Sequence, residues 1–260
     1  MSTRPPIAPK IHMSPIQPTH DQVPVLYVIV VYAVILFALW NIPGARVVIN
    51  PLKLFAIGWH EMCHAIVAVL TGGSVTKMTI DPIMGGCTQV DGGHPLSILS
   101  AGYIGSTLLG AIFVLGGFDT LVAKILSFVA GVGIIAPLAL VRDKLRVQTI
   151  LLTLIYEALL IGFWFIDHGQ ALRWYILFLG INHIFYAVWD VTDDKFFRKP
   201  NESDATQFSL LYPKVPPHVW AIFWISFQVA VLIAFVLIGI ASFKRTTDQM
   251  YLEASHFLPT

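Results

Sequence analysis

The sequence predicts an all-α, polytopic membrane helix bundle with about six or seven transmembrane helices and one small β-hairpin. Hydrophobic residues make up 56% of the 260 residues and charged residues only 12%, whereas a soluble domain carries about 25% charged residues. The apolar residues gather in runs near the length of about 20 residues that crosses about 30 Å of hydrocarbon as a helix. Backbone polar groups must be paired inside lipid, so these runs are predicted to be helices.

Seven apolar runs are candidates for membrane spans. They cover residues 23–40, 52–71, 97–116, 121–141, 149–166, 174–190 and 219–241. The first 22 residues are rich in proline and polar residues and form no compact element. The chain is therefore expected to divide into three parts: a flexible N-terminal tail over 1–22, a single transmembrane domain over 23–241, and a short C-terminal tail over 242–260.

Two polar segments between the runs have distinct patterns. Residues 72–96 contain three glycine pairs, and between them Val75 to Ile80 alternates as a strand does. Residues 87–90 could return as the partner strand, so this segment is predicted to be the β-hairpin. Residues 191–218 are polar and end in several prolines, and we expect them to form a surface loop.

Charge and cysteine content exclude several classes of function. The formal net charge is +1, and the sequence has no basic run and no phosphate-binding glycine motif. We therefore expect neither nucleic acid nor a nucleotide as a partner, and the lipid bilayer is the predicted environment. Cys63 and Cys87 are the only cysteines, too few for a disulfide framework, and both are expected to be free thiols.

The motif that predicts chemistry is His60-Glu61-x-x-His64, inside the second apolar run. Residues four apart on a helix lie on the same face, so both imidazoles can bind one metal ion. Glu61 lies about 100° around the helix from His60, where it can point at a water in the open metal position. Zinc lowers the pKa of such a water to about 7, and a glutamate can take its proton during attack on a peptide carbonyl.

A purely structural role for these three residues is the alternative. A buried histidine or glutamate can be a hydrogen-bonded core residue or an ion-pair partner. Here, however, three ionisable groups lie within five residues of an apolar run. Each costs about 2–3 kcal/mol or more at membrane depth if it has no partner, which favours a metal site.

The motif and its flanking segments resemble the site-2 proteases, zinc metallopeptidases that cleave substrates within the membrane, and are most similar to the subfamily-B-like branch. The supporting segments are Phe55 five residues before His60, Leu70-Thr71-Gly72-Gly73, Gly85-Gly86-Cys87-Thr88 and Ala101-Gly102-Tyr103-Ile104-Gly105-Ser106. The resemblance covers about residues 52–210. It implies a Zn²⁺ cofactor, His60 and His64 as ligands, and Glu61 as the catalytic acid/base.

The same resemblance implies a third ligand, an aspartate on a later helix within Asn-Pro-Asp-Gly or Leu-Asp-Gly. Neither motif occurs in a later span of this sequence. In the sixth run, His183, Tyr186 and Asp190 share one helical stripe that can face the interior. Asp190 is the predicted third metal ligand. His183 is the alternative ligand, or a hydrogen-bond donor to one.

Depth along the helices supports this choice. Asp190 follows Trp174 by 16 residues and His64 follows Pro51 by 13, which is about 24 Å and about 20 Å of helix. His183 lies at about 14 Å, level with His60. Three other aspartates are less favourable, because two lie beyond the predicted helix end and one would require the hairpin to fold back. They are Asp193, Asp194 and Asp91.

Small residues recur every four positions in the third run, at Gly102, Ser106 and Gly110. Small residues at this spacing let helices approach closely. We expect them to pack against a neighbouring helix, with the zinc helix as the neighbour.

The predicted function is that of an intramembrane zinc metalloendopeptidase. It would hydrolyse peptide bonds of membrane-embedded or membrane-proximal proteins or peptides through a zinc-activated water, and the hairpin would hold the substrate by strand addition. One alternative is a non-peptidase protein that binds or transports metal through His60, His64 and His183. Another is a protease-like fold without turnover that escorts membrane proteins. Glu61 favours hydrolysis, because neither alternative needs a glutamate beside the first histidine.

Overall fold

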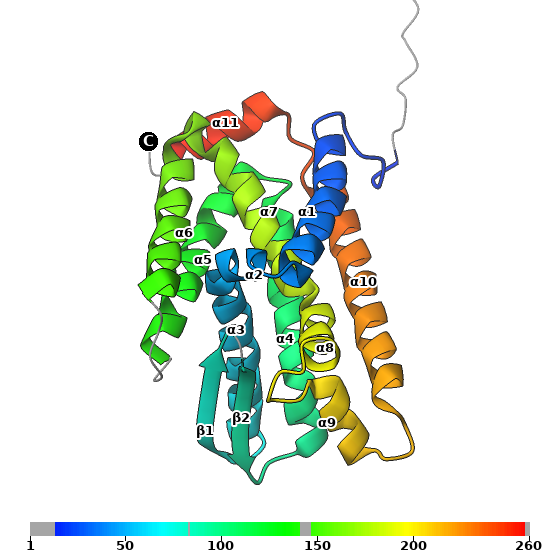
Figure 1. Cartoon of the computed structure of the whole chain (residues 1–260). Coiled ribbons are helices and arrows are strands. Elements are labelled where there is room, and N and C mark those ends of the chain that lie inside the picture. Colours follow the sequence, from blue (N-terminus) through cyan, green and yellow to red (C-terminus); the bar gives the residue numbers. More distant parts are fainter. Residues whose placement is uncertain (1–13, 83, 141–146, 258–260) are drawn as a thin grey trace, which may run out of the picture.

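Long helices carry most of the chain in the computed structural model, which describes residues 14–82, 84–140 and 147–257 (Figure 1). The elements are α1 (Val23–Asn41), α2 (Ala45–Val48), α3 (Asn50–Leu70), β1 (Ser74–Asp81), β2 (Gly85–Asp91), α4 (Pro95–Gly116), α5 (Thr120–Leu140), α6 (Val147–Phe165), the 3₁₀ turn η1 (Asp167–Gly169), α7 (Gln170–Ile184), α8 (Tyr186–Lys195), α9 (Asp204–Leu211), α10 (Pro217–Ser242) and α11 (Thr247–His256).

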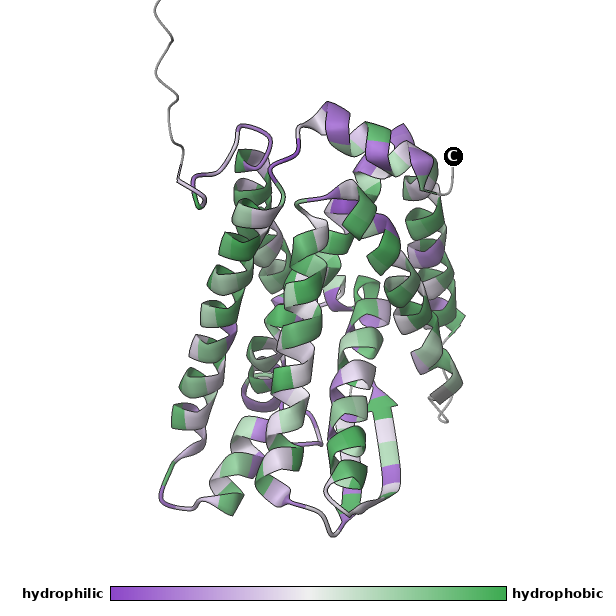
Figure 2. Cartoon of the chain, turned by 180° about the vertical axis from the view of Figure 1, so that it is seen from behind, coloured by the Kyte–Doolittle hydropathy of each residue, from purple (hydrophilic) through white to green (hydrophobic). Residues whose placement is uncertain are grey.

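Helices α1, α3, α4, α5, α6 and α10 are each long and apolar enough to cross a membrane. The bent pair α7 and α8 could form a seventh span. Hydrophobic residues predominate along these helices, whereas hydrophilic residues gather in α11 and in the connections at the two ends (Figure 2). Many of the hydrophobic side chains are exposed. The predicted all-α membrane bundle with a small hairpin is confirmed.

Helix α4 lies at the centre of the bundle and packs against α3, α5, α7 and α10. Within their most apolar windows, α3 and α4 are 61% and 56% buried, compared with 17% for α6 and α10. The two central helices therefore bury most of their polar positions inside the protein. In contrast, α6 and α10 present mainly apolar residues to the surroundings.

Glycines on α4 allow close approach to two neighbours rather than one. A Cβ atom at Gly105 would overlap the Cys63 side chain on α3, and one at Gly110 would overlap the backbone of Ile184 on α7. The expected packing against the zinc helix is therefore correct for one side of α4. The row of small residues also packs against α7, at Gly110.

The β-hairpin follows α3, the helix that carries the His60-Glu61-x-x-His64 motif, as predicted, and both strands contact α3. Strands β1 and β2 pair antiparallel, from Ser74 opposite Asp91 to Asp81 opposite Gly85. Gly85 has a φ of +84°, a conformation that a residue with a side chain adopts at a cost. The hairpin is longer at both ends than the alternating segment predicted.

The sixth predicted span, 174–190, is not a single straight helix. The chain breaks at Phe185 between α7 and α8, which are bent relative to each other by 52°. The Trp189 indole Nε1 bridges the break by donating to the Asn182 carbonyl oxygen at 2.8 Å. Helix α8 therefore leaves the direction of α7 and continues to Lys195.

The segment predicted to be a surface loop, 191–218, contains the end of α8 and all of α9. Helix α9 packs against α4, α8 and α10, and Phe208 on α9 is fully buried. The loop prediction is wrong for these residues. Part of the polar composition reflects hydrogen bonds made inside the protein, because Asp193, Ser203 and Thr206 are buried. Residues 195–198 and 210–214 are exposed.

Part of the predicted C-terminal tail is also helical. Helix α11 lies across one end of the bundle (Figure 1). Its end is held by Lys124 Nζ of α5, which donates to the Ala254 carbonyl oxygen at 2.8 Å. On the N-terminal side, Gln22 donates to the Phe243 carbonyl oxygen at 2.6 Å. The division into two tails and one domain stays a prediction.

Candidate metal centre

The two histidines of the motif form the base of the site. Helix α3 begins with Pro51 in its first turn, where a missing N–H costs nothing, and carries His60 and His64 one turn apart. Their Nε2 atoms lie 3.0 Å from each other. Both side chains are buried, as is Glu61 between them. One ligand atom from each of these three residues lies within 4.8 Å of the others.

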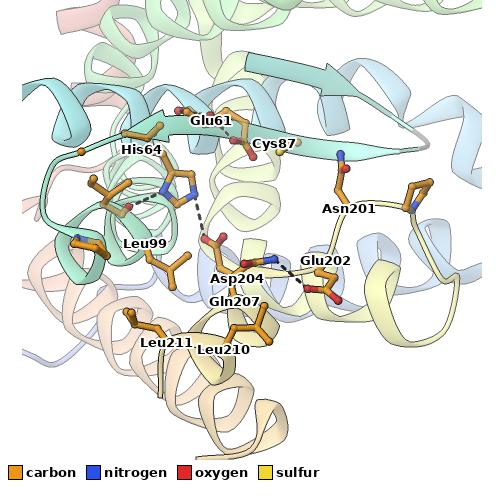
Figure 3. Close-up of a pocket in the computed structure, with 17 residues that line it drawn as sticks. Glu61, His64, Cys87, Leu99, Asn201, Glu202, Asp204, Gln207, Leu210 and Leu211 are labelled. Atoms are coloured by element: carbon orange, nitrogen blue, oxygen red, sulfur yellow. Dashed lines mark hydrogen bonds and ion pairs between the residues drawn. The ribbon is translucent and has the colours of Figure 1, made fainter. Parts of the chain in front are cut away.

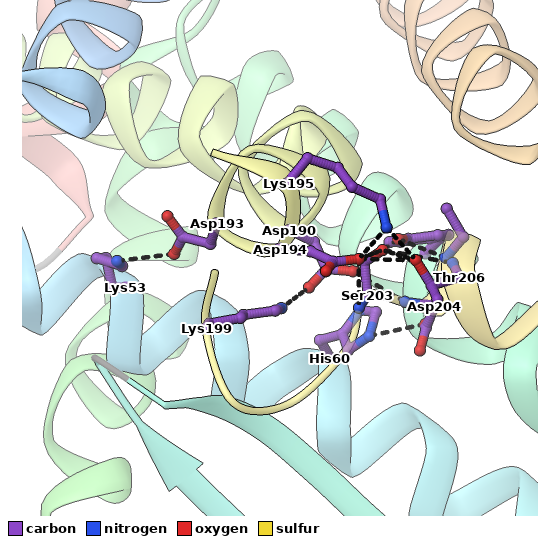
Figure 4. A network of polar contacts seen from close by, with 12 residues as sticks. Lys53, His60, Asp190, Asp193, Asp194, Lys195, Lys199, Ser203, Asp204 and Thr206 are labelled. Carbon is purple, nitrogen blue, oxygen red and sulfur yellow. Dashed lines mark hydrogen bonds and ion pairs between the residues drawn. The ribbon is translucent and has the colours of Figure 1, made fainter. Parts of the chain in front are cut away.

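A carboxylate that the sequence analysis did not identify meets both imidazoles. Asp204 Oδ2 lies 2.9 Å from His60 Nε2 and 3.2 Å from His64 Nε2 (Figures 3 and 4). Asp204 is the first residue of α9, and Ser203 before it is the N-cap whose side chain accepts from the Thr206 backbone N–H. The helix start therefore fixes where the carboxylate points.

These three ligand atoms fit a zinc ion. Their mutual distances are 2.9, 3.0 and 3.2 Å. Ligands bound to zinc at about 2.0–2.1 Å in tetrahedral geometry are about 3.3 Å apart. Burial raises the pKa of the Asp204 carboxyl group, but His64 and His60 lower it more, and the net shift is downward. Two imidazoles and one carboxylate, with a fourth position free, are a donor set used by catalytic zinc sites.

Groups behind the imidazoles fix their orientation. His64 Nδ1 lies 2.6 Å from the Ile98 carbonyl oxygen, so it donates there and leaves Nε2 as the ligand atom. The His60 ring packs against the Tyr186 ring with centroids 4.3 Å apart. His60 Nδ1 is buried and has no hydrogen-bond partner among the described residues. On α4, Gly102 leaves space for both rings, because a Cβ atom there would overlap them.

The hairpin positions Glu61. Its Oε2 accepts a hydrogen bond of 2.6 Å from the Thr88 hydroxyl group on β2. A Cβ atom at Gly86 on the same strand would overlap the Glu61 carboxylate. Strand β2 therefore both orients the glutamate and leaves the space that it occupies, near His64 (Figure 3).

A cavity of about 840 Å³ opens onto these groups. Glu61, His64 and Asp204 are among its lining residues, and β2 lines one part of it. The opposite part is lined by α4, by α9 and by the segment between α8 and α9 (Figure 3). Its apolar lining residues include Leu99, Leu210 and Leu211, and its polar ones include Asn201, Glu202 and Gln207.

The residue predicted to be the third ligand lies elsewhere. Asp190 accepts a hydrogen bond of 2.6 Å from the Tyr103 hydroxyl group and pairs with Lys199. The structure brings Asp204, not Asp190, to the imidazoles. The physical reason is the bend at Phe185, which ends the straight helix on which the depth comparison depended.

The other candidates are also engaged away from the imidazoles. His183 Nδ1 lies 2.9 Å from the Leu179 carbonyl oxygen, and its ring packs edge-on against Phe55. Asp193 pairs with Lys53 at 2.9 Å. Asp91 is exposed at the end of β2. None of these contacts is with the ligand atoms of the two histidines.

The sequence did hold one local signal for Asp204. Ser203-Asp204 followed by an apolar residue is typical of a helix start, with serine as N-cap and an acid in the first turn. That signal predicts a short helix in a polar segment. It does not predict that the helix folds back onto α3 with its first carboxylate against the zinc motif.

Comparison with known protein families decides the identity of the chain. The family model described as Peptidase M50B-like matches residues 29–235. The chain belongs to the Peptidase M50B-like family. A search of curated proteins and a search of solved structures gave no match. The family assignment confirms the resemblance to site-2 proteases, and with the apolar helices it makes the chain a multi-pass membrane metallopeptidase.

Proposed function

We propose that this M50B-like protein is an intramembrane zinc endopeptidase in which His60, His64 and Asp204 hold Zn²⁺ and Glu61 is the catalytic acid/base. The observation that supports this most strongly is the Asp204 carboxylate, which meets both imidazoles at distances that suit a shared zinc ion. When bound, zinc would lower the pKa of a water molecule and polarise the scissile carbonyl group.

Glu61 has the position and the partner that proton transfer requires. It lies beside the ligand atoms, buried, with one carboxylate oxygen fixed by Thr88. The carboxylate can accept a proton from the attacking water and then pass it to the leaving amine nitrogen. Burial excludes competing water and strengthens the electrostatic interactions within the site.

The substrate is proposed to be a membrane-embedded or membrane-proximal peptide segment in an extended conformation. The peptide bond of a helix is enclosed by its own hydrogen bonds, so the segment must unwind before it enters the cavity. Strand β2 borders the cavity beside Glu61, and we propose that the substrate main chain pairs with this strand. The proposed partners are therefore polypeptides, with the bilayer as the surrounding phase.

The test separates metal binding from chemistry. Glu61→Gln is expected to retain one zinc ion per chain and to lose cleavage, because the ligands remain and the proton acceptor is lost. Asp204→Ala is expected to lose zinc as well as cleavage. Zinc is measured by mass spectrometry of the purified full chain. Cleavage is measured by comparing the membrane proteomes of cells that express the wild type or Glu61→Gln.

Two results would contradict the proposal. Cleavage that persists in zinc-loaded Glu61→Gln would remove Glu61 from the reaction and favour a metal-binding or metal-transporting role for the fold. Full zinc content in Asp204→Ala, together with zinc loss in Asp190→Ala, would return the third ligand to Asp190.

A further inference from the structure

We propose that Asp190 is a positioning residue: it holds the first turn of α9 so that the Asp204 carboxylate lies against the two imidazoles. This inference rests on the proposed zinc ligands. It assigns a role to a buried carboxylate that does not itself touch the histidines.

Both oxygen atoms of Asp190 are engaged around the start of α9. Oδ2 accepts hydrogen bonds from the Asp204 backbone N–H at 3.1 Å and from the Tyr103 hydroxyl group at 2.6 Å. Oδ1 pairs with Lys199. The side chains of Asp190 and Lys199 are each only 5% exposed, so water competes little for these bonds (Figure 4).

The bond to the Asp204 N–H determines where the ligand residue lies. The first N–H groups of a helix have no partner within the helix, and a negative charge near them is favourable. Asp190 accepts from the first of them. The Tyr103 hydroxyl oxygen accepts from the next, the Ala205 N–H, at 3.2 Å. The backbone that carries the Asp204 side chain is therefore fixed by two linked acceptors.

A second carboxylate on α8 holds the neighbouring residues. Asp194 Oδ2 accepts from the Ser203 backbone N–H at 3.1 Å, from its hydroxyl group at 2.6 Å, and from the Thr206 hydroxyl group at 2.7 Å. One turn of α8 therefore supplies two carboxylates that accept hydrogen bonds from residues 203, 204 and 206. The first turn of α9 cannot shift without breaking several of these bonds.

Helix α8 is in turn attached to the zinc helix. Asp193 pairs with Lys53 on α3 at 2.9 Å and accepts from the Trp40 indole nitrogen at 2.9 Å. Lys53 precedes His60 by seven residues, two turns of the same helix. Helix α8 is therefore a bracket between α3, which carries the histidines, and α9, which carries Asp204. On α8, Asp193 contacts α3, and Asp190 contacts the backbone of Asp204.

Lys199 completes the arrangement. It supplies the charge that compensates the buried Asp190. Burial lowers the pKa of Lys199, but Asp190 raises it more, so the amine stays protonated. Its aliphatic chain passes over the hairpin turn, where a Cβ atom at Gly85 would lie 3.1 Å from the Lys199 Cδ atom. The segment before α9 is therefore held between the hairpin and α8.

The experiment measures zinc affinity, by competition with a chelator, in the purified full chain. Asp190→Asn is expected to bind zinc about 10- to 100-fold more weakly, as is typical when a group that orients a ligand is removed. Tyr103→Phe, which removes only the hydroxyl group, should weaken binding in the same direction. Asp119→Asn is the matched control, because Asp119 is also a buried carboxylate in an ion pair, with Arg245 at 2.8 Å, but lies beyond the far end of α4 from Gly102. It should lower the melting temperature but leave the zinc affinity unchanged.

Cobalt replacement gives a readout that a purely structural role would not move. The ligand-field absorption bands of Co²⁺ depend on the geometry of its ligands. Asp190→Asn should shift these bands relative to the wild type while Asp119→Asn leaves them in place. If Asp190→Asn does not fold, Tyr103→Phe and Lys199→Met decide the matter by the same two measurements.

Three outcomes would overturn the inference. Wild-type zinc affinity in Asp190→Asn would show that Asp204 is held without it. Zinc loss as complete as in Asp204→Ala would make Asp190 a ligand. An equal loss of affinity in Asp119→Asn would reduce the effect to general destabilisation. If the variants change zinc affinity as expected but the wild type cleaves no substrate, the proposed reaction is refuted and the positioning role of Asp190 stands.

Discussion

Gly102→Ala is expected to remove zinc from a folded protein. Gly102 lies on α4 directly behind the two imidazoles. A Cβ atom added there would lie 2.5 Å from His64 Nε2 and 2.6 Å from His60 Nε2. Ordinary Cβ contacts begin at 3.4 Å. Each ligand atom would therefore have to move by about 0.8–0.9 Å, whereas a zinc site tolerates deviations of about 0.2 Å in its bond lengths.

The expected magnitude follows from this displacement. Removal of a group that only orients a ligand weakens metal binding about 10- to 100-fold, and Gly102→Ala displaces two ligands directly, so a loss of at least ~100-fold is expected. Retreat of α4 would not relieve the overlap without loss, because the same helix is packed closely against α7 at Gly110. Alanine is also the better helix former, by about 1 kcal/mol, so unfolding is not the expected cause.

The assay is zinc content and chelator competition on the purified chain, with the melting temperature measured in parallel. Gly162→Ala on α6 is the matched control, because a Cβ atom there meets nothing within 4 Å. It should bind zinc as the wild type does. If Gly102→Ala folds and binds zinc with wild-type affinity, the arrangement of the imidazoles against α4 is wrong.

Two further substitutions test the surroundings of Glu61. Thr88→Val removes the hydroxyl group that donates to Glu61 Oε2 at 2.6 Å. A hydrogen bond to a charged group contributes about 1.5–3 kcal/mol, so kcat should fall about 10- to 100-fold with zinc content unchanged; an unchanged kcat would show that Thr88 does not orient the glutamate. Cys87 lines the same cavity, whereas Cys63 lines a separate groove. A bulky maleimide is therefore expected to block cleavage in the wild type and in Cys63→Ser, but not in Cys87→Ser. Burial raises the pKa of the Cys87 thiol, and the thiolate is the reactive form, so inactivation should speed up as the pH rises above 7. Equal sensitivity of Cys87→Ser would place the reactive thiol elsewhere.

The membrane spans were predictable because lipid imposes a length and a composition on them. The apolar runs gave the six long helices within a few residues at most ends, and the glycine pairs gave the hairpin. The grouping of His60, Glu61 and His64 was predictable for a related reason, because it depends only on the helical repeat. That the group binds zinc stays a prediction, favoured because three ionisable groups in an apolar run have few explanations other than a shared metal ion.

The position of Asp204, the proposed third ligand, was not predictable from the same kind of reasoning. Its position depends on a bend at Phe185, which no proline or glycine at that point signals, and on the return of α9 toward α3. From hydropathy alone, residues 174–190 are predicted to be one straight helix. Once α8 departs from the axis of α7 by 52°, a depth counted along the helix no longer says which side chain reaches the histidines.

The polar residues of α8 and of the segment after it explain why the composition wrongly predicted a surface loop. In a soluble protein, such a cluster of acids, lysines and serines would be expected in water. Here the carboxylates of Asp190, Asp193 and Asp194 each have partners on a different element, from α3 and α4 to the start of α9. An unpaired charge near lipid is costly, so Asp193 and Asp194, which were predicted to lie in a surface loop, are instead paired with groups of α3 and of the start of α9. The requirement that favours a metal at His60 and His64 therefore also builds the bracket that brings Asp204 to them.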